Sequence, residues 1–95
     1  MKLEPEDAED LEEQLHKYDG LSHLRVKTWG ASLIVYSGDS DAPQKHAKLN
    51  HLGRDVWNLS LPRHTGRWET TPFVGSLEEI RETLISNFGF YLEKP

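Results

Sequence analysis

The sequence predicts an α+β fold, in which an antiparallel sheet of four or five strands follows an acidic helix and packs against a second, amphipathic helix. Three observations predict this class. Residues 5–18 and 76–88 carry apolar side chains at helical spacing. Between them, residues 21–71 form short segments that favour strands. Turns rich in glycine and proline separate these segments, so we expect the strands to pair in sequence order, as a meander.

The first helix is expected to run from Pro5 to about Tyr18. Proline is favoured in the first turn of a helix, and the acidic residues that follow it suit the positive end of the helix dipole. The pair Asp19-Gly20 then ends the helix. The apolar side chains lie three or four residues apart and form one narrow face: Ala8, Leu11, Leu15 and Tyr18.

The first two strands form the clearest local prediction, a hairpin around Trp29-Gly30-Ala31. Residues 21–28 alternate in polarity, which is the pattern of a half-buried strand. The second strand, Leu33–Tyr36, is β-branched and aromatic. Residues 37–44 combine glycine, proline, serine and aspartate, and we expect them to form a loop.

The next segment, Ala47–Leu52, is ambiguous, because alternation fits a strand while residues 44–52 could also form a short helix. We favour the strand, since Gly53 then turns the chain into a clear strand at Val56–Leu61. A short last strand is expected at Trp68–Thr71, with Pro72 at its end or at an edge position.

The last helix has the strongest start signal in the chain. Ser76 and Glu79 have the spacing of a capping box, in which each side chain accepts a hydrogen bond from the other residue's backbone. Gly89 is expected to end the helix, and an apolar tail, Phe90–Leu92, then packs back or meets another chain. The expected core comprises Leu11, Leu15, Leu24, Val26, Leu33, Val35, Leu49, Trp57, Leu59, Leu61, Phe73, Leu77, Ile80, Leu84 and Phe88.

Length and composition indicate one domain, residues 1–95, in a cytoplasmic protein. At 95 residues the chain has room for a single core. It contains no cysteine, and its first residues have no apolar segment of the kind found in signal peptides. The longest apolar run, Leu33–Tyr36, is far shorter than the roughly 20 residues of a membrane span, so we expect no membrane partner.

Charge is distributed unevenly along the chain, which has a net charge of −5. Residues 1–20 carry eight acidic and two basic residues, whereas residues 42–68 carry five basic residues and one acidic residue. This asymmetry predicts contact with charged partners.

The main functional hypothesis is a non-catalytic protein-interaction module that binds a protein partner or itself, as a homodimer. Arginine binds carboxylates through two parallel hydrogen bonds, and tryptophan is a common anchor at interfaces. The contact surfaces would be the turn that carries Arg63, His64, Arg67 and Trp68, and the acidic helix face that carries Glu9, Glu12 and Glu13. The structural alternatives are an ordinary hairpin turn and a solvated helix face.

The alternative hypothesis is nucleic-acid binding through the basic segment 42–68, with the acidic N-terminal helix as a cover. Lysine and arginine would contact phosphates, and Trp29 or Trp68 would lie nearby. The basic residues of this segment are Lys45, Lys48, Arg54, Arg63 and Arg67.

The sequence predicts no catalytic, cofactor or metal site. His64 could pair with Asp55 or Glu69, yet no strained turn of the GxSxG type presents a nucleophile. The chain also has no glycine-rich loop of the kind that binds phosphate, because its glycines are separated from one another in the sequence. Because His46 and His51 are five residues apart, they share neither a helix face nor a strand face.

Overall fold

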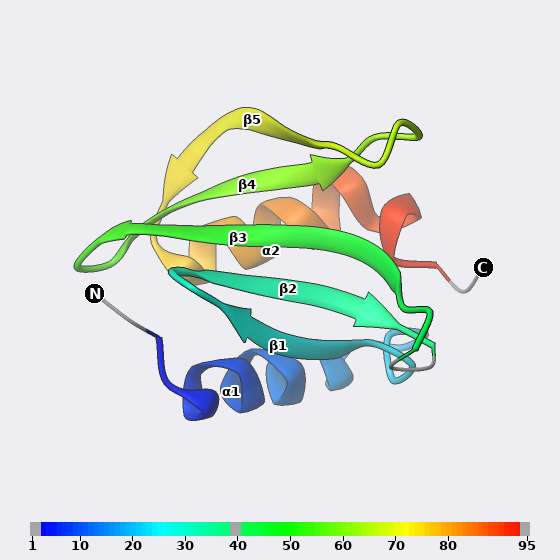
Figure 1. The fold of residues 1–95 in the computed structure, drawn as a ribbon. Coiled ribbons are helices and arrows are strands. Elements are labelled where there is room, and N and C mark those ends of the chain that lie inside the picture. Colours follow the sequence, from blue (N-terminus) through cyan, green and yellow to red (C-terminus); the bar gives the residue numbers. More distant parts are fainter. Residues whose placement is uncertain (1–2, 39–40, 94–95) are drawn as a thin grey trace.

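The computed structural model describes residues 3–38 and 41–93, and it confirms the expected α+β fold (Figure 1). The expected strand at Ala47–Leu52 is confirmed as part of a longer strand. The elements in chain order are α1 (Pro5–His16), β1 (Arg25–Trp29), β2 (Ser32–Ser37), β3 (Gln44–Gly53), β4 (Val56–Pro62), β5 (Trp68–Gly75), α2 (Leu77–Phe88) and the 3-10 helix η1 (Gly89–Leu92).

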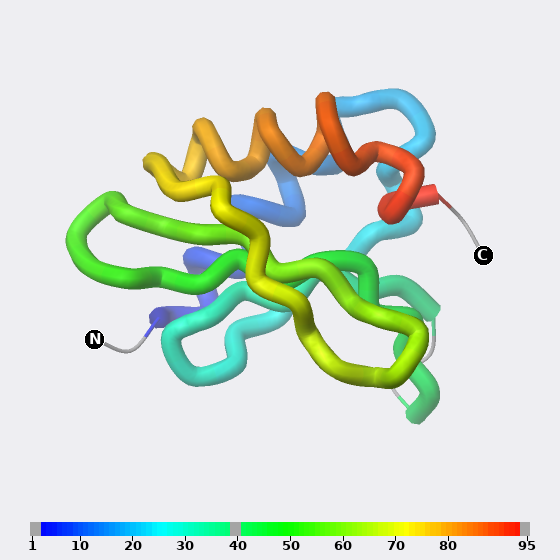
Figure 2. Tube along the Cα trace, turned by 90° about the horizontal axis from the view of Figure 1, so that it is seen from above, coloured from blue at the N-terminus to red at the C-terminus, as the bar shows by residue number. Residues whose placement is uncertain are grey.

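The five strands form one antiparallel meander in the order β1-β2-β3-β4-β5. Both helices lie behind the sheet, α1 next to β1 and α2 behind β4 and β5 (Figures 1 and 2). The face of the sheet that packs on the helices is called the inner face here, and the opposite one the outer face. No helix of the described chain covers the outer face.

The inner face and the two helices enclose the core. Alternation along each strand directs one set of side chains to this face, as expected for a sheet that is covered on one side. Leu77 and Phe88 are only partly buried, and Phe73 was expected in the core but is 36% exposed. The buried core residues that the sequence predicted are Leu11, Leu15, Leu24, Val26, Leu33, Val35, Leu49, Trp57, Leu59, Leu61, Ile80 and Leu84.

A β-bulge in β3 changes which side chains share a face. Val35 pairs with Ala47 and Tyr36 pairs with Lys45, so His46 is an extra residue in β3. His46 and Ala47 are both buried on the inner face. The bulge therefore places Lys45 and Lys48, which are three residues apart, on the outer face together. In a regular strand they would point to opposite faces.

The bulge also corrects the expected positions of His46 and His51. Simple alternation predicts that residues five apart point to opposite faces, yet both imidazoles lie on the inner side. The His51 ring stacks on Trp57, with ring centroids 4.5 Å apart, while His46 lies towards the other end of β3. The two histidines thus share a face without forming one cluster.

The last strand is longer than predicted, because β5 continues past Pro72 to Gly75. Asn58 pairs with Val74 and Ser60 pairs with Thr70, so β5 has extra residues opposite Leu59. Pro72 falls in this irregular part of an edge strand, where a missing N–H donor is tolerated. The irregularity also turns Phe73 away from the core, towards an edge-to-face contact with Phe88.

The C-terminal tail packs back onto the sheet through η1. Leu92 is fully buried, whereas Phe90 remains exposed. Two histidines bind the backbone of this segment: the His46 Nδ1–H donates to the Tyr91 carbonyl, and the His23 Nε2–H donates to the Leu92 carbonyl over 2.7 Å. The tail is therefore part of the core rather than a free extension.

The packing of α2 against β4 and β5 leads to a stability prediction. Leu84 is fully buried, and replacing it with alanine would leave a cavity in the core. We expect Leu84→Ala to lower the free energy of unfolding by about 3 kcal/mol. Leu52→Ala is the matched control, because Leu52 is 56% exposed. Chemical denaturation followed by tryptophan fluorescence measures both, and equal midpoints for the two variants would contradict this description of the core.

Candidate binding face of the sheet

The outer face of the sheet combines aromatic and basic side chains. Successive rows of cross-strand pairs place them together: Lys27 pairs with Ile34, Ile34 with Lys48, and Lys48 with Ser60. Arg25 pairs with Tyr36, and Tyr36 pairs with Lys45. At one end of the sheet, Trp68 pairs with Pro62. Neighbouring strands are about 4.8 Å apart, so these side chains form one continuous surface.

A cavity of about 210 Å³ lies on this face. Ile34, which is buried, forms part of its lining, and tryptophan side chains contribute the indole rings. Trp29 is 66% exposed, far more than a tryptophan that serves only the core. We name this surface the Trp–Lys patch; its residues are Lys27, Trp29, Ile34, Lys45, Lys48 and Trp68.

Cation–π contacts hold two of the lysines against aromatic rings. The Lys48 Nζ lies 5.7 Å from the centroid of the Trp68 ring, and the Lys27 Nζ lies 5.0 Å from that of the Tyr36 ring. Each contact contributes about 0.5–1 kcal/mol at an exposed site and restricts a flexible side chain. The charges are therefore positioned over the face, and both lysines remain partly exposed.

Beside the patch, a row of hydroxyl and amide groups crosses the sheet from β2 to β5. The Ser32 hydroxyl donates to the Asn50 Oδ1 over 2.8 Å. The Asn50 Nδ2 in turn donates to the Asn58 Oδ1 over 2.8 Å and to the Ser60 Oγ over 2.9 Å. Ser60 and Thr70 share a hydrogen bond of 3.1 Å. This network fixes the orientation of these side chains on the outer face.

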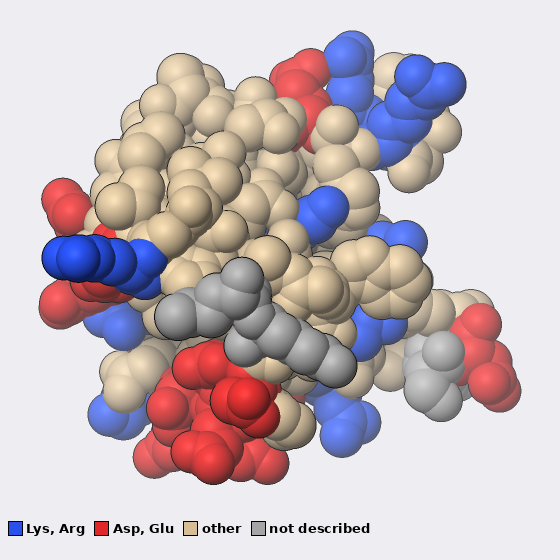
Figure 3. Space-filling view, turned by 60° about the vertical axis from the view of Figure 1, so that its left-hand side comes forward, with Lys and Arg blue, Asp and Glu red and all other residues tan. Residues whose placement is uncertain are grey.

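The charge of the chain is divided between its two layers. Strands β1 to β4 contain no acidic residue at all, and β5 contains only Glu69. By contrast, the helical layer carries most of the acids. Figure 3 shows the largest group of acidic side chains at the bottom of the view, where α1 lies, while basic side chains lie along the right-hand side and also at the left edge. Among the described residues, no lysine of the patch pairs with a carboxylate.

The structure separates the two interaction surfaces that the sequence suggested. Arg63, His64 and Arg67 lie exposed in the β4–β5 turn, where Arg63 pairs with Glu69 at 2.8 Å. Trp68, whose position the sequence left open, is half-buried on the outer face. The acidic residues Glu9, Glu12 and Glu13 belong to α1, far from this turn (Figure 1).

Helix α1 does not lie over the basic segment in this structure. Its apolar residues pack into the core behind β1. One of its acidic groups has a structural task, because the Glu12 carboxylate accepts a hydrogen bond of 2.9 Å from the backbone N–H of Val26. This contact occupies a backbone donor of the edge strand β1, which would otherwise be open to strand pairing.

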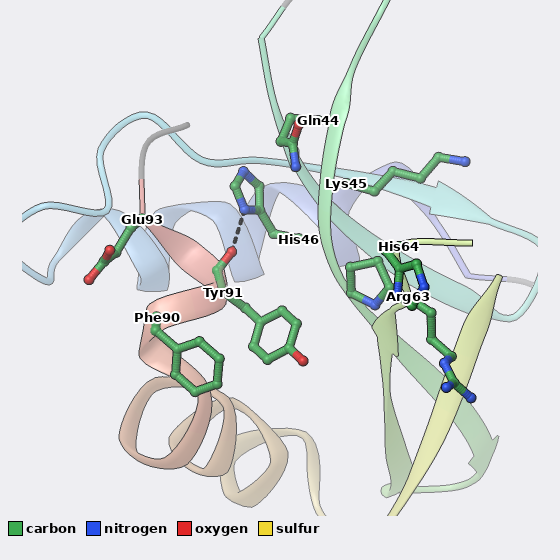
Figure 4. A pocket seen from close by; sticks show the side chains of 9 residues that line it. Gln44, Lys45, His46, Arg63, His64, Phe90, Tyr91 and Glu93 are labelled. Carbon is green, nitrogen blue, oxygen red and sulfur yellow. Dashed lines mark hydrogen bonds between the residues drawn. The ribbon is translucent and has the colours of Figure 1, made fainter. Parts of the chain in front are cut away.

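A second, larger cavity of about 420 Å³ lies between η1 and the adjacent ends of β3 and β4 (Figure 4). Phe90 and Tyr91 contribute its aromatic side, and the basic side comes from the strands and the β4–β5 turn. The Glu93 carboxylate points away from Arg63 and His64. The full lining is Gln44, Lys45, His46, Pro62, Arg63, His64, Phe90, Tyr91 and Glu93.

At the back of this second cavity, His46 is buried and fully hydrogen-bonded. Its Nδ1–H donates to the Tyr91 carbonyl, so its Nε2 accepts a bond of 2.7 Å from the Ser37 hydroxyl in the neutral ring. Burial lowers the pKa of His46 below the ordinary value of 6.5, the bond to Tyr91 opposes this shift, and the nearby His23 adds to it. His46 is therefore neutral at pH 7 and holds η1 in place.

The described residues contain no group of three or more acidic, histidine or cysteine side chains that could hold a metal ion. None of the helices in the described ranges is long and apolar enough to cross a membrane. Comparison with known proteins gives no match to a family model, to a curated protein or to a solved structure.

Sequence reasoning identified only part of the patch. The basic segment and its tryptophans predict a surface with Lys45, Lys48 and Trp29 or Trp68, but no pattern in the sequence connects Lys27 or Ile34 with it. The polar row of Asn50 and Ser60 was also missed. One signal was present in the sequence: residues 20–38 contain no acidic residue, which is unusual for a chain with 28% charged residues.

The environment of His46 predicts how stability depends on pH. The unfolded chain takes up a proton at this residue near pH 6.5, whereas the folded chain does so only at lower pH. We therefore expect the free energy of unfolding to fall as pH decreases from 7 through 6.5, by up to about 1.4 kcal/mol per pH unit from this group, until the pKa of the folded state is passed.

Denaturation curves at several pH values test this expectation in the wild-type protein and in His46→Gln. The substitution should flatten the pH dependence of the free energy of unfolding below pH 7, whereas Leu52→Ala, which changes an exposed residue without a titratable group, should leave it unchanged. An identical slope in wild type and His46→Gln would show that His46 does not carry the effect.

Proposed function

We propose that this protein is a non-catalytic binding module that holds single-stranded nucleic acid on the outer face of its sheet. The observation that carries the proposal is the Trp–Lys patch, in which indole rings and three lysines surround one cavity on an uncovered face of the sheet. Proteins that bind single strands commonly combine aromatic platforms for bases with a positively charged path for the phosphates.

Each component of the patch has a role in such binding. The exposed Trp29 ring offers a stacking surface, and base–aromatic stacking is worth about 1–3 kcal/mol per base. Lys27, Lys45 and Lys48 would neutralise phosphates and release the counterions that surround them. The row of amides and hydroxyls beside the patch could contact base edges or sugars.

A protein is the other candidate ligand for the outer face of the sheet. Interfaces between proteins are rich in tryptophan, tyrosine and arginine but depleted in lysine. Lysine is the main cation of this face, which favours a polyanion over an ordinary protein surface. A second copy of the chain fits less well, because a two-fold contact through the patch would bring lysines close to lysines without acidic residues from β1 to β4.

The net charge of −5 does not oppose the proposal, because the acidic residues are concentrated elsewhere in the fold. Helix α1 and its acids lie behind the sheet, while β1 to β4 carry only basic charges. A molecule with its charge divided in this way has a local positive field at the outer face, and that field would orient an approaching polyanion.

Fluorescence anisotropy with labelled single-stranded DNA and RNA oligonucleotides tests the proposal. With three phosphates neutralised, the affinity should fall about twentyfold between 50 mM and 200 mM salt. The same sequences as duplexes should bind more weakly, because their bases are already stacked on one another and cannot lie on the indole rings.

Substitutions in the patch give a second test. Trp29→Ala should weaken binding on the order of tenfold at constant salt. Lys48→Ala should weaken it and reduce the salt dependence, whereas Lys17→Ala, a lysine at the end of α1, should have little effect. If no oligonucleotide binds at low salt, and a protein is recovered from lysate with and without nuclease, the proposal is wrong and a protein partner takes its place.

A further inference from the structure

The two cavities of the molecule are adjacent rather than independent. Lys45 lines both of them. Pro62 in the larger cavity is also the cross-strand partner of Trp68 in the patch. The surface of the Trp–Lys patch therefore continues across Lys45 and this pair towards η1 and the β4–β5 turn.

The larger cavity repeats the chemistry of the patch. Phe90 is 65% exposed, and the centroid of its ring lies 4.6 Å from the centroid of the Tyr91 ring. On the other side of the cavity, Lys45, Arg63 and His64 contribute to the lining, and the charged ends of Lys45 and Arg63 extend away from the two rings towards the outside (Figure 4). Core packing explains the burial of the neighbouring Leu92 but not the exposure of Phe90.

We propose that one nucleic-acid strand follows this whole path, from Trp29 across Lys45 to the cavity between η1 and the β4–β5 turn. This inference rests on the proposed function and specifies the extent of the site. Trp29 and Trp68 hold the first bases, Lys45 holds the phosphate at the junction, and Phe90 stacks on a later base.

The ion pair between Arg63 and Glu69 is compatible with a role in this path. Only one guanidinium nitrogen, Nη1, contacts the Glu69 carboxylate, at 2.8 Å. Guanidinium has five N–H donors, so others can contact a phosphate while this bond is kept. Both partners are exposed, and the pair itself contributes little to stability.

The length of the oligonucleotide separates this inference from the function on which it rests. An oligonucleotide of about four nucleotides should fill only the patch, and one of about ten should reach the second cavity. We expect the tenmer to bind wild-type protein at least tenfold more tightly than the tetramer. Phe90→Ala and Arg63→Ala should each remove much of this advantage and leave tetramer binding unchanged.

Lys45→Ala should weaken the binding of both lengths, because Lys45 lines both cavities, and Lys17→Ala should affect neither. If the tenmer binds no better than the tetramer, or if Phe90→Ala and Arg63→Ala leave tenmer affinity unchanged, the extended path is wrong while the binding face stands. If neither length binds wild-type protein at low salt, both proposals fail together. Unchanged melting temperatures would show that the variants keep the fold.

Discussion

The β-bulge at His46 is the constraint on which both faces of the sheet depend. If β3 were a regular strand through His46, Lys45 would point into the core on the same face as Ala47, where a buried ammonium would have no partner. With it, His46 turns inward and Lys45 turns outward. One local irregularity thus supplies the inner face with a group that binds η1 and supplies the outer face with a cation shared by two cavities.

The same bulge links the C-terminal segment to the sheet. His46 bonds the carbonyl of Tyr91, and His23 bonds that of Leu92, so two residues distant in sequence hold the last described turn of the chain. This attachment buries Leu92 and positions the rings of Phe90 and Tyr91 along one side of the second cavity. The two histidine hydrogen bonds therefore support both the packing of Leu92 in the core and the aromatic lining of that cavity.

A sheet covered on only one side also explains how an acidic chain can present a basic surface. Two helices of twelve residues each cover the inner face, and they carry much of the negative charge. The outer face has no covering element in the described chain and no acid in its first four strands. In such a molecule the net charge is a poor guide to the charge of the ligand. The distribution of charge between the two layers is a better guide, because the ligand is affected mainly by the local field at the surface it approaches.

Much of the fold was predictable, because local rules govern it. The capping box of Ser76 and Glu79 starts α2 as expected, and the hairpin of β1 and β2 follows from alternation and a glycine turn. The end of β5 and the exposure of Phe73 were not predictable, since the irregular pairing around Pro72 depends on the neighbouring strand. The position of Trp68 depended in the same way on which face of the sheet stayed uncovered.

By itself the sequence determined the class of fold, the order of its elements, most of the core and the uneven distribution of charge, because spacing and composition encode these properties directly. Only the tertiary structure decided which charged residues meet. Lys27, Lys45 and Lys48 come from two strands and from both sides of a bulge, and a shift of one residue in pairing reverses the face to which a side chain points. The surface that carries the proposed function is therefore a product of strand register, which no single segment of the sequence specifies.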